Sequence, residues 1–121
     1  GVNTRVHLAE VETALRERIN HSWMEQGVTV LDPANTYIAA RVRIGSDTIL
    51  LPNTHLQGET TVGSGCTIGP NSVIHDSVIA DGCRVECSVL EQATLEENVD
   101  VGPFGHPMLN RIGAGLKAGG F

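Results

Sequence analysis

The chain has 121 residues, a mass of 12.8 kDa and a formal net charge of −6. Only 3% of its residues are aromatic, which excludes nucleic-acid binders that stack bases on aromatic side chains, and an acidic chain does not favour phosphate backbones. No apolar run approaches the roughly 18 residues that a membrane span needs. We therefore expect one small soluble domain, or a small domain with an appendage, and no nucleic-acid or membrane partner.

Residues 4–26 are predicted to form one amphipathic helix. Apolar residues recur at steps of three and four on one face, at Leu8, Val11, Leu15, Ile19 and Trp23. Gly27 is a natural stop, and residues 28–31 follow as a short β-prone run. The apolar face needs a cover, and the simplest cover is the β structure of the same chain or of a second subunit.

From residue 38 the sequence repeats every six residues. Aliphatic residues occupy one register without a break, at Ile38, Ile44, Leu50, Leu56, Val62, Ile68 and Ile74. Small or β-branched residues stand four places later, at Val42, Thr48, Thr54, Thr60, Cys66, Ser72 and Val78. Residues that tolerate left-handed backbone angles precede several of these, at Asp47, Asn53, Gly65 and Asn71. This is the hexapeptide pattern of a parallel β-helix.

The fold class predicted is mainly β: a left-handed parallel β-helix preceded by one long α-helix. Three hexads close a triangular coil of about 18 residues, with the aliphatic side chain inside. After Ile74 the pattern continues with steps of five or six, through Ile79, Val85, Leu90, Leu95 and Val101. Residues 105–121 are rich in glycine and lose the period, which predicts a frayed or irregular end.

The cysteines and the N-terminus favour a cytoplasmic protein. Cys66, Cys83 and Cys87 form an odd set without the second ligand pair of a zinc site. We expect them to be reduced residues of the core or surface. The first residues also lack the basic and apolar pattern of a secretory signal.

Five segments around the repeat form a more specific pattern. They are Gly1-Val-Asn3, the helix with Leu8-Ala-Glu10, Gly27-Val-Thr-Val-Leu-Asp-Pro33, Thr36-Tyr-Ile38 and Val101-Gly-Pro-Phe104. In order and spacing they resemble the bifunctional N-acetylglucosamine-1-phosphate uridylyltransferase/glucosamine-1-phosphate acetyltransferase family over residues 1–104. Hexapeptide repeats alone are shared by many acyltransferases, so the flanking segments carry the resemblance.

The resemblance implies two parts of a larger enzyme. Residues 1–36 would be the linker helix and short strand that end the uridylyltransferase domain, and residues 37–121 a truncated β-helix acetyltransferase domain that forms a homotrimer. The family acetylates glucosamine 1-phosphate from acetyl-CoA, then uses UTP and Mg²⁺ to make UDP-N-acetylglucosamine for the cell wall. The sugar phosphate, UTP and acetyl-CoA are thus expected to bind the parent enzyme, and none of them to bind this chain tightly.

The same resemblance implies two substrate-binding residues. Asn3 matches the family asparagine that helps to hold Mg²⁺ and UDP-N-acetylglucosamine, and its carboxamide oxygen suits a hard cation. Its alternative role is an N-cap of the helix. Arg111 matches the arginine that binds the sugar phosphate, if a short insertion follows Phe104. The family's general-base histidine has no counterpart, so we predict no catalytic residue and no activity of this chain alone.

Three of the five histidines are candidates for other sites. His55 and His75 stand about one coil apart, which would place them on nearby faces, but no third metal ligand is evident. His106 follows the Gly-Pro-Phe segment and is most simply a solvated loop residue. We therefore predict no histidine metal site.

Two further functions remain open. The chain would be a non-catalytic β-helical trimerisation module if it forms a stable trimer that binds no acetyl-CoA. It would be a different hexapeptide acyltransferase if it binds acetyl-CoA and acetylates another amine or hydroxyl. The repeat is compatible with all three functions, and only the flanking segments favour the bifunctional enzyme.

Overall fold

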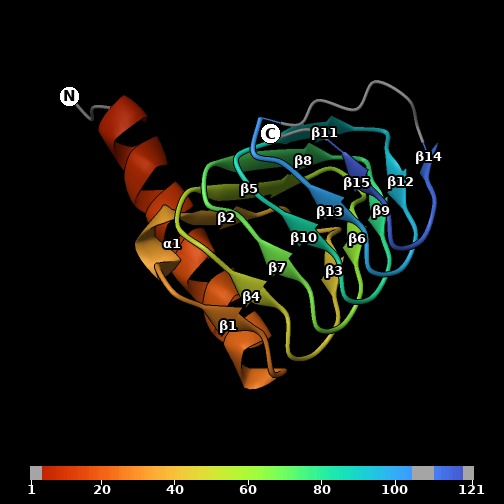
Figure 1. Ribbon diagram of the computed structural model, residues 1–121. Coiled ribbons are helices and arrows are strands. Elements are labelled where there is room, and N and C mark those ends of the chain that lie inside the picture. Colours follow the sequence, from red (N-terminus) through yellow and green to blue (C-terminus); the bar gives the residue numbers. More distant parts are fainter. Residues whose placement is uncertain (1–3, 105–110, 119–121) are drawn as a thin grey trace.

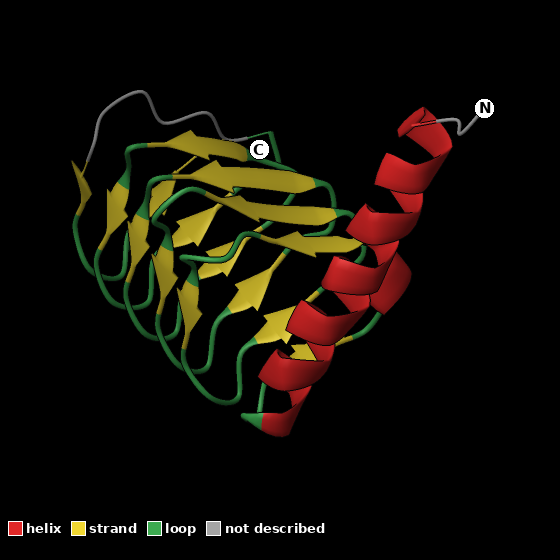
Figure 2. Cartoon of the chain, turned by 180° about the vertical axis from the view of Figure 1, so that it is seen from behind, coloured by secondary structure: helices red, strands yellow, loops and turns green. Residues whose placement is uncertain are grey.

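The computed structural model describes residues 4–104 and 111–118 of the chain. A long helix, α1 (Thr4–Glu25), leans against one end of a column of short strands (Figures 1 and 2). A 3-10 helix, η1 (Pro33–Asn35), links β1 to β2. The strands are β1 (Thr29–Val30), β2 (Thr36–Ile38), β3 (Arg43–Ile44), β4 (Ile49–Leu50), β5 (Thr54–Gln57), β6 (Thr61–Val62), β7 (Thr67–Ile68), β8 (Ser72–His75), β9 (Val78–Ile79), β10 (Arg84–Val85), β11 (Val89–Glu91), β12 (Thr94–Leu95), β13 (Asp100–Val101), β14 (Arg111–Ile112) and β15 (Lys117–Ala118).

The strands form three parallel sheets, and the chain visits each sheet once per coil. The first sheet has the order β1-β4-β7-β10-β13-β15, the second β2-β5-β8-β11 and the third β3-β6-β9-β12-β14. We call these sheets A, B and C. Figure 2 shows the coils stacked along one axis with the loops at their corners. The predicted left-handed parallel β-helix preceded by one long α-helix is confirmed.

The predicted aliphatic positions form the core of the β-helix. Each of them is at most 8% exposed. The buried set is Ile38, Ile44, Leu50, Leu56, Val62, Ile68, Ile74, Ile79, Val85, Leu90, Leu95 and Val101. Each side chain stacks on its counterpart one coil away, as Leu56 does on Ile38 and Ile74. Because no coil can enclose its own apolar face, neighbouring coils stabilise each other.

The later coils are shorter than the first ones. Thr36 pairs with Thr54, which pairs with Ser72, so each early coil contains three complete hexads. Val73 pairs with Val89, so this later coil is shorter than three hexads. The predicted change of step after Ile74 is therefore confirmed.

Because of this shortening, the prediction that Val78 points inward is wrong. The six-residue period places Val78 among the small residues near the corners, but its side chain is 50% exposed. The buried small residue of that coil is Ser77, which is 0% exposed. Ser77 comes one place earlier than a strict period predicts, and a shift of one place moves a side chain to the other face of its strand.

The corners have the backbone angles that the sequence predicts. Asp47, Asn53, Gly65 and Asn71 have φ values of 64°, 60°, 66° and 53°. Gly63 has a different reason to be glycine. A Cβ built on it would meet the Asp81 carboxylate and lie 2.7 Å from the Asp81 backbone nitrogen in the next coil.

Buried hydroxyl groups connect successive coils at the corners. Thr60 Oγ1 donates to the Gln57 carbonyl (2.8 Å) and accepts from the backbone N–H of Ser77 (3.2 Å). Ser77 Oγ then donates to the His75 carbonyl (3.0 Å) and accepts from the N–H of Ala93 (3.1 Å). Each hydroxyl thus gives one buried amide its acceptor and adds a second donor to a carbonyl.

The C-terminal stretch continues the β-helix further than predicted. We expected residues 105–121 to be irregular, but β14 and β15 extend sheets C and A. Ile112 pairs with Leu95 and Ala118 with Val101, so the core register goes on for another coil. The prediction was wrong here because Ala118 is small and its position was not recognised as apolar. Residues 105–110 and 119–121 lie outside the described part.

Only half of the helix is covered by the β-helix. Ile19 and Trp23 pack against its core, while Leu8, Val11 and Leu15 are 58%, 40% and 44% exposed. Figure 1 shows the N-terminal half of α1 projecting beyond the sheets. The part of the chain that the structure describes therefore leaves some of the predicted apolar face exposed.

Candidate functional site

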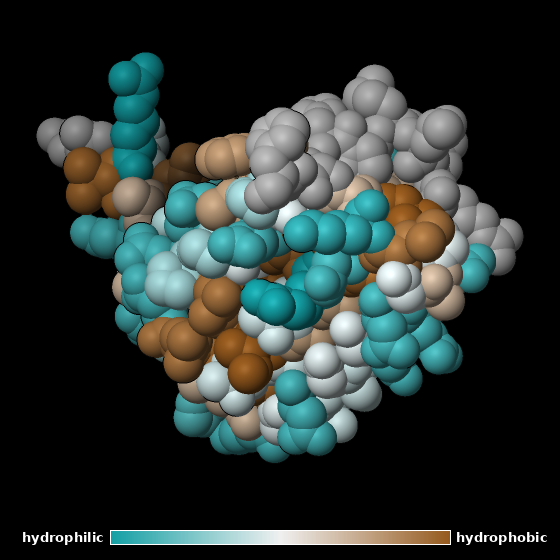
Figure 3. Space-filling model, in the orientation of Figure 1, coloured by the Kyte–Doolittle hydropathy of each residue, from teal (hydrophilic) through white to brown (hydrophobic). Residues whose placement is uncertain are grey.

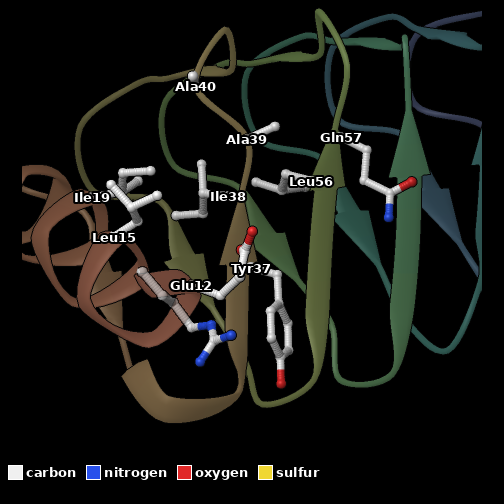
Figure 4. A pocket seen from close by; sticks show the side chains of 10 residues that line it. Glu12, Leu15, Ile19, Tyr37, Ile38, Ala39, Ala40, Leu56 and Gln57 are labelled. Atoms are coloured by element: carbon white, nitrogen blue, oxygen red, sulfur yellow. The ribbon is translucent and has the colours of Figure 1, made fainter. Parts of the chain in front are cut away.

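A groove lies where α1 meets the first coil. It has a volume of about 350 Å³ and runs between the helix and strands β2 and β5. Its wall on the helix side includes Glu12 and Arg16, and its opposite side includes Tyr37 and Gln57 (Figure 4). The groove combines an apolar floor with a few polar groups, which is typical of small-molecule sites.

Three stacked side chains join the helix to sheet B at this groove. The Arg16 guanidinium lies 4.5 Å from the centre of the Tyr37 ring, a cation–π contact. The Tyr37 ring stacks on the His55 ring, with 4.4 Å between centroids and 11° between planes. Tyr37 and His55 pair directly in sheet B, one coil apart, so the repeat length could have revealed this contact.

The two histidines considered as metal ligands share one face. His55 and His75 both point outward from sheet B, where His55 pairs with Val73 and His75 with Gln57. His55 Nε2 lies 3.1 Å from Asn53 Oδ1, and His75 Nε2 lies 3.4 Å from Asp76 Oδ2. Within residues 4–104 and 111–118, no group of three or more His, Cys, Asp or Glu side chains could hold a metal ion.

A second groove follows the outer face of sheet C. It has a volume of about 380 Å³, and Val78, Thr94 and Glu97 contribute to its lining. Arg111 begins β14 and pairs with Thr94, so its backbone lies next to this groove. Arg111 thus stands directly before the inward Ile112, just as its partner Thr94 stands directly before the inward Leu95.

The remaining predicted site residues are not placed. Asn3 and His106 lie outside the described residues, so the structure does not test whether Asn3 lies near Arg111. The N-cap role of Asn3 is therefore a prediction too.

Two buried thiols stand in successive coils at the corner between sheets C and A. Cys66 and Cys83 are 1% and 0% exposed. The neighbouring Cys83 thiol, as a hydrogen-bond donor to the Cys66 thiolate, lowers the pKa of Cys66 to about 7, and the same interaction together with burial raises the pKa of Cys83. This pairing was not predicted, although the two cysteines stand close to one coil apart in the sequence.

Comparison with known proteins agrees with this architecture. The bacterial transferase hexapeptide model (six repeats) matches residues 41–76. The bifunctional protein GlmU of Caldanaerobacter subterraneus subsp. tengcongensis is 53% identical over 88% of this chain and 23% of its own length. GlmU of Exiguobacterium sibiricum is 50% identical over 100% of this chain and 27% of its own length. The resemblance to the bifunctional transferase family is confirmed. The chain spans about a quarter of the length of these GlmU relatives.

A solved structure shares the fold at low identity. It is a histidine-to-alanine mutant of GDP-perosamine N-acetyltransferase from Caulobacter crescentus, in complex with CoA and GDP-perosamine. The identity is 12% and the TM-score 0.58, over 90% of this chain and 62% of that one. In the described part of this chain, no helix is long and apolar enough to cross a membrane.

Proposed function

We propose that this chain is the linker helix and the first coils of the acetyltransferase domain of a bifunctional GlmU-type enzyme. The observation that supports this best is the 50% identity to GlmU along 100% of the chain. The order of a long helix followed by hexapeptide coils agrees with it. In this proposal, residues 1–36 end the uridylyltransferase part and residues 37–121 begin the acetyltransferase part.

The proposed enzyme acetylates glucosamine 1-phosphate from acetyl-CoA and uridylylates the product with UTP to UDP-N-acetylglucosamine for cell-wall synthesis. Acetyl transfer needs a general base that takes the proton of the sugar amine, and positioning of the two substrates. Arg111 is proposed to bind the sugar phosphate, because a guanidinium makes paired hydrogen bonds with phosphate oxygens. We expect the enzyme to be cytoplasmic.

Asn3 is proposed as the residue of this chain that helps to hold Mg²⁺ and the nucleotide sugar. A carboxamide oxygen is a suitable ligand for a hard cation. Because residues 4–104 and 111–118 contain no cluster of His, Cys, Asp or Glu that could hold a metal ion by itself, the other ligands would belong to the rest of the enzyme. The metal neutralises phosphate charge in nucleotidyl transfer.

We also propose that the β-helix forms a homotrimer with the acetyl-transfer site between subunits. Apolar side chains on the outer surface support an oligomer. Leu31 is 60% exposed beside β1, and Ile49 and Leu51 are half-buried on the neighbouring strand β4 and directly after it. Figure 3 shows brown groups over this part of sheet A and at the projecting end of α1. A partner subunit would remove these groups from water.

The activity test compares two samples. The native protein is captured from source cells with an antibody to residues 38–104, and the 121-residue chain is purified separately. We expect CoA release with glucosamine 1-phosphate, and pyrophosphate release with UTP and N-acetylglucosamine 1-phosphate, from the captured protein only. CoA release from the isolated chain would contradict the predicted inactivity. A captured protein with neither activity would contradict the proposed enzyme and favour a trimerisation module.

A further inference from the structure

Cys66 and Cys83 occupy equivalent places in neighbouring coils. Thr67 and Arg84, the residues that follow them, pair directly in sheet A, and the Thr67 amide donates to the Cys83 carbonyl at 2.9 Å. The two cysteines therefore lie side by side with both side chains inside the β-helix. Thr48 holds the same place one coil earlier, so the thiols continue a column of hydroxyl-type residues.

We propose that Cys66 and Cys83 form a redox-active pair that closes to a disulfide between two successive coils of the β-helix. The proposal goes beyond the transferase function and does not depend on it. It assigns a role to two buried nucleophilic groups that acetyl transfer and nucleotidyl transfer do not use.

The geometry permits the bond with a small adjustment. Neighbouring strands lie about 4.7–4.9 Å apart, which falls within the Cα separation of about 4.4–6.8 Å that disulfides span. Each thiol donates to a carbonyl of the following coil, Cys66 to Ala80 at 3.2 Å and Cys83 to Glu96 at 3.1 Å. Disulfide formation breaks these two weak bonds, which favours a bond that is easily reduced again.

Both thiols lie inside the β-helix, with Cys66 1% and Cys83 0% exposed. An oxidant therefore reaches them when the corner between sheets C and A opens locally. Cys87, by contrast, is half-buried at a different corner, between sheets A and B.

Formation of the disulfide needs a small two-electron oxidant. The test uses diamide, a compound with an N=N double bond (a diazene). The Cys66 thiolate adds to one nitrogen of the N=N bond. Cys83 then attacks the Cys66 sulfur, forms the S–S bond and displaces that nitrogen. Two S–H bonds break and one S–S bond forms, and the two electrons and two protons reduce the diazene to a hydrazine. Since the thiolate is the nucleophile and the pKa of Cys66 is about 7, the rate should level off above about pH 8.

The test treats the folded 121-residue chain with diamide below its unfolding temperature. We expect a mass loss of about 2 Da, a peptide in which Cys66 is linked to Cys83, and reversal by dithiothreitol. The thermal midpoint of the oxidised protein should rise, because the cross-link restricts the unfolded chain.

Matched variants locate the bond. Cys66→Ser and Cys83→Ser retain a hydroxyl where Thr48 has one, so both should fold, and both should lose the mass change. Cys87→Ser should keep it. Oxidation only through Cys87, as a dimer, would overturn the proposal. So would the absence of any mass change at diamide concentrations that oxidise free cysteine, in a protein whose circular dichroism shows it to be folded.

Discussion

Gly63 shows at the residue scale how tightly neighbouring coils approach. Its place at the corner between sheets C and A leaves no room for a Cβ beside the Asp81 backbone, whose nitrogen would lie 2.7 Å away. Asp81 Oδ1 accepts the Ser64 amide at 2.8 Å, so the two coils are also bonded there. The glycine is thus required by contact with the next coil rather than by its own backbone angles.

Gly63→Ala should therefore lower the free energy of unfolding by about 1–3 kcal/mol, because the coils must shift apart. Gly113→Ala is the matched control. Gly113 holds the same repeat position, and a Cβ there would lie 3.6 Å from Leu116 Cδ1, an ordinary contact. Urea unfolding of both variants measures the difference. Equal loss in the two variants would contradict the steric explanation.

Leu56 tests the core at the same scale. It is 0% exposed in β5, between Ile38 and Ile74. Leu56→Ala should lower the free energy of unfolding by about 2–5 kcal/mol, because it leaves a cavity inside the stack of core side chains. Val78→Ala, at a position that is 50% exposed, should change the free energy by less than about 0.5 kcal/mol. Similar losses for both in denaturant unfolding would contradict the inward and outward assignment.

At the scale of elements, Asn20 joins α1 to the β-helix. Its side chain is 0% exposed, and its amide donates to the carbonyls of Pro33 (2.9 Å) and Thr36 (3.0 Å). The sequence pattern does not single out this residue, because a polar residue in a helix usually faces water. Contact with the loop around η1 exists only after the chain has folded back on the helix.

Asn20→Ala should loosen the helix, because it leaves two buried carbonyls without these donors. We expect the free energy of unfolding to fall by about 1–3 kcal/mol in all. Amide hydrogen exchange should rise in residues 16–25 more than in sheets B and C. Gln26→Ala is the control, because the bonds of Gln26 to Ser22 are exposed. Unchanged exchange in the Asn20 variant would contradict the proposed link.

The Arg16–Tyr37–His55 stack is a second link between the same elements. Tyr37→Leu should lose both the cation–π contact and the ring stacking. Together these losses should lower the free energy of unfolding by about 1–2 kcal/mol. Tyr37→Phe keeps the ring and should retain most of the stability. Thermal unfolding of the two variants provides the measurement. Equal losses for Phe and Leu would show that the phenol hydroxyl, not the ring, matters.

For the whole molecule, the half-covered helix predicts an unequal response to truncation. Removal of residues 1–11 takes away exposed side chains such as Leu8, and should leave the unfolding temperature of the β-helix nearly unchanged. Removal of residues 1–26 also uncovers the core under Ile19 and Trp23. This longer truncation should lower the unfolding temperature by several degrees. Calorimetry distinguishes these results. A large loss from the first truncation would mean that the projecting half stabilises the chain through another subunit.

Much of this molecule was predictable from local pattern. The six-residue period identified the inward aliphatic residues, the corner residues with positive φ and the early coil length. The reason is that a solenoid repeats one local environment, so equivalent positions in each coil need the same kind of residue. The family-like segments that flank the repeat pointed to the relatives, whereas Asn3 and Arg111 as ligands remain predictions.

Other features depended on contacts between coils and could not be read along the chain. A shortened coil exchanged the roles of Ser77 and Val78, and Ala118 proved to be a core position. The contact of Arg16 with Tyr37 and the buried amide of Asn20 arise only when the helix meets the β-helix. Periodicity specifies which face a side chain takes, but the partner that it meets there is set by how the coils and the helix stack in space.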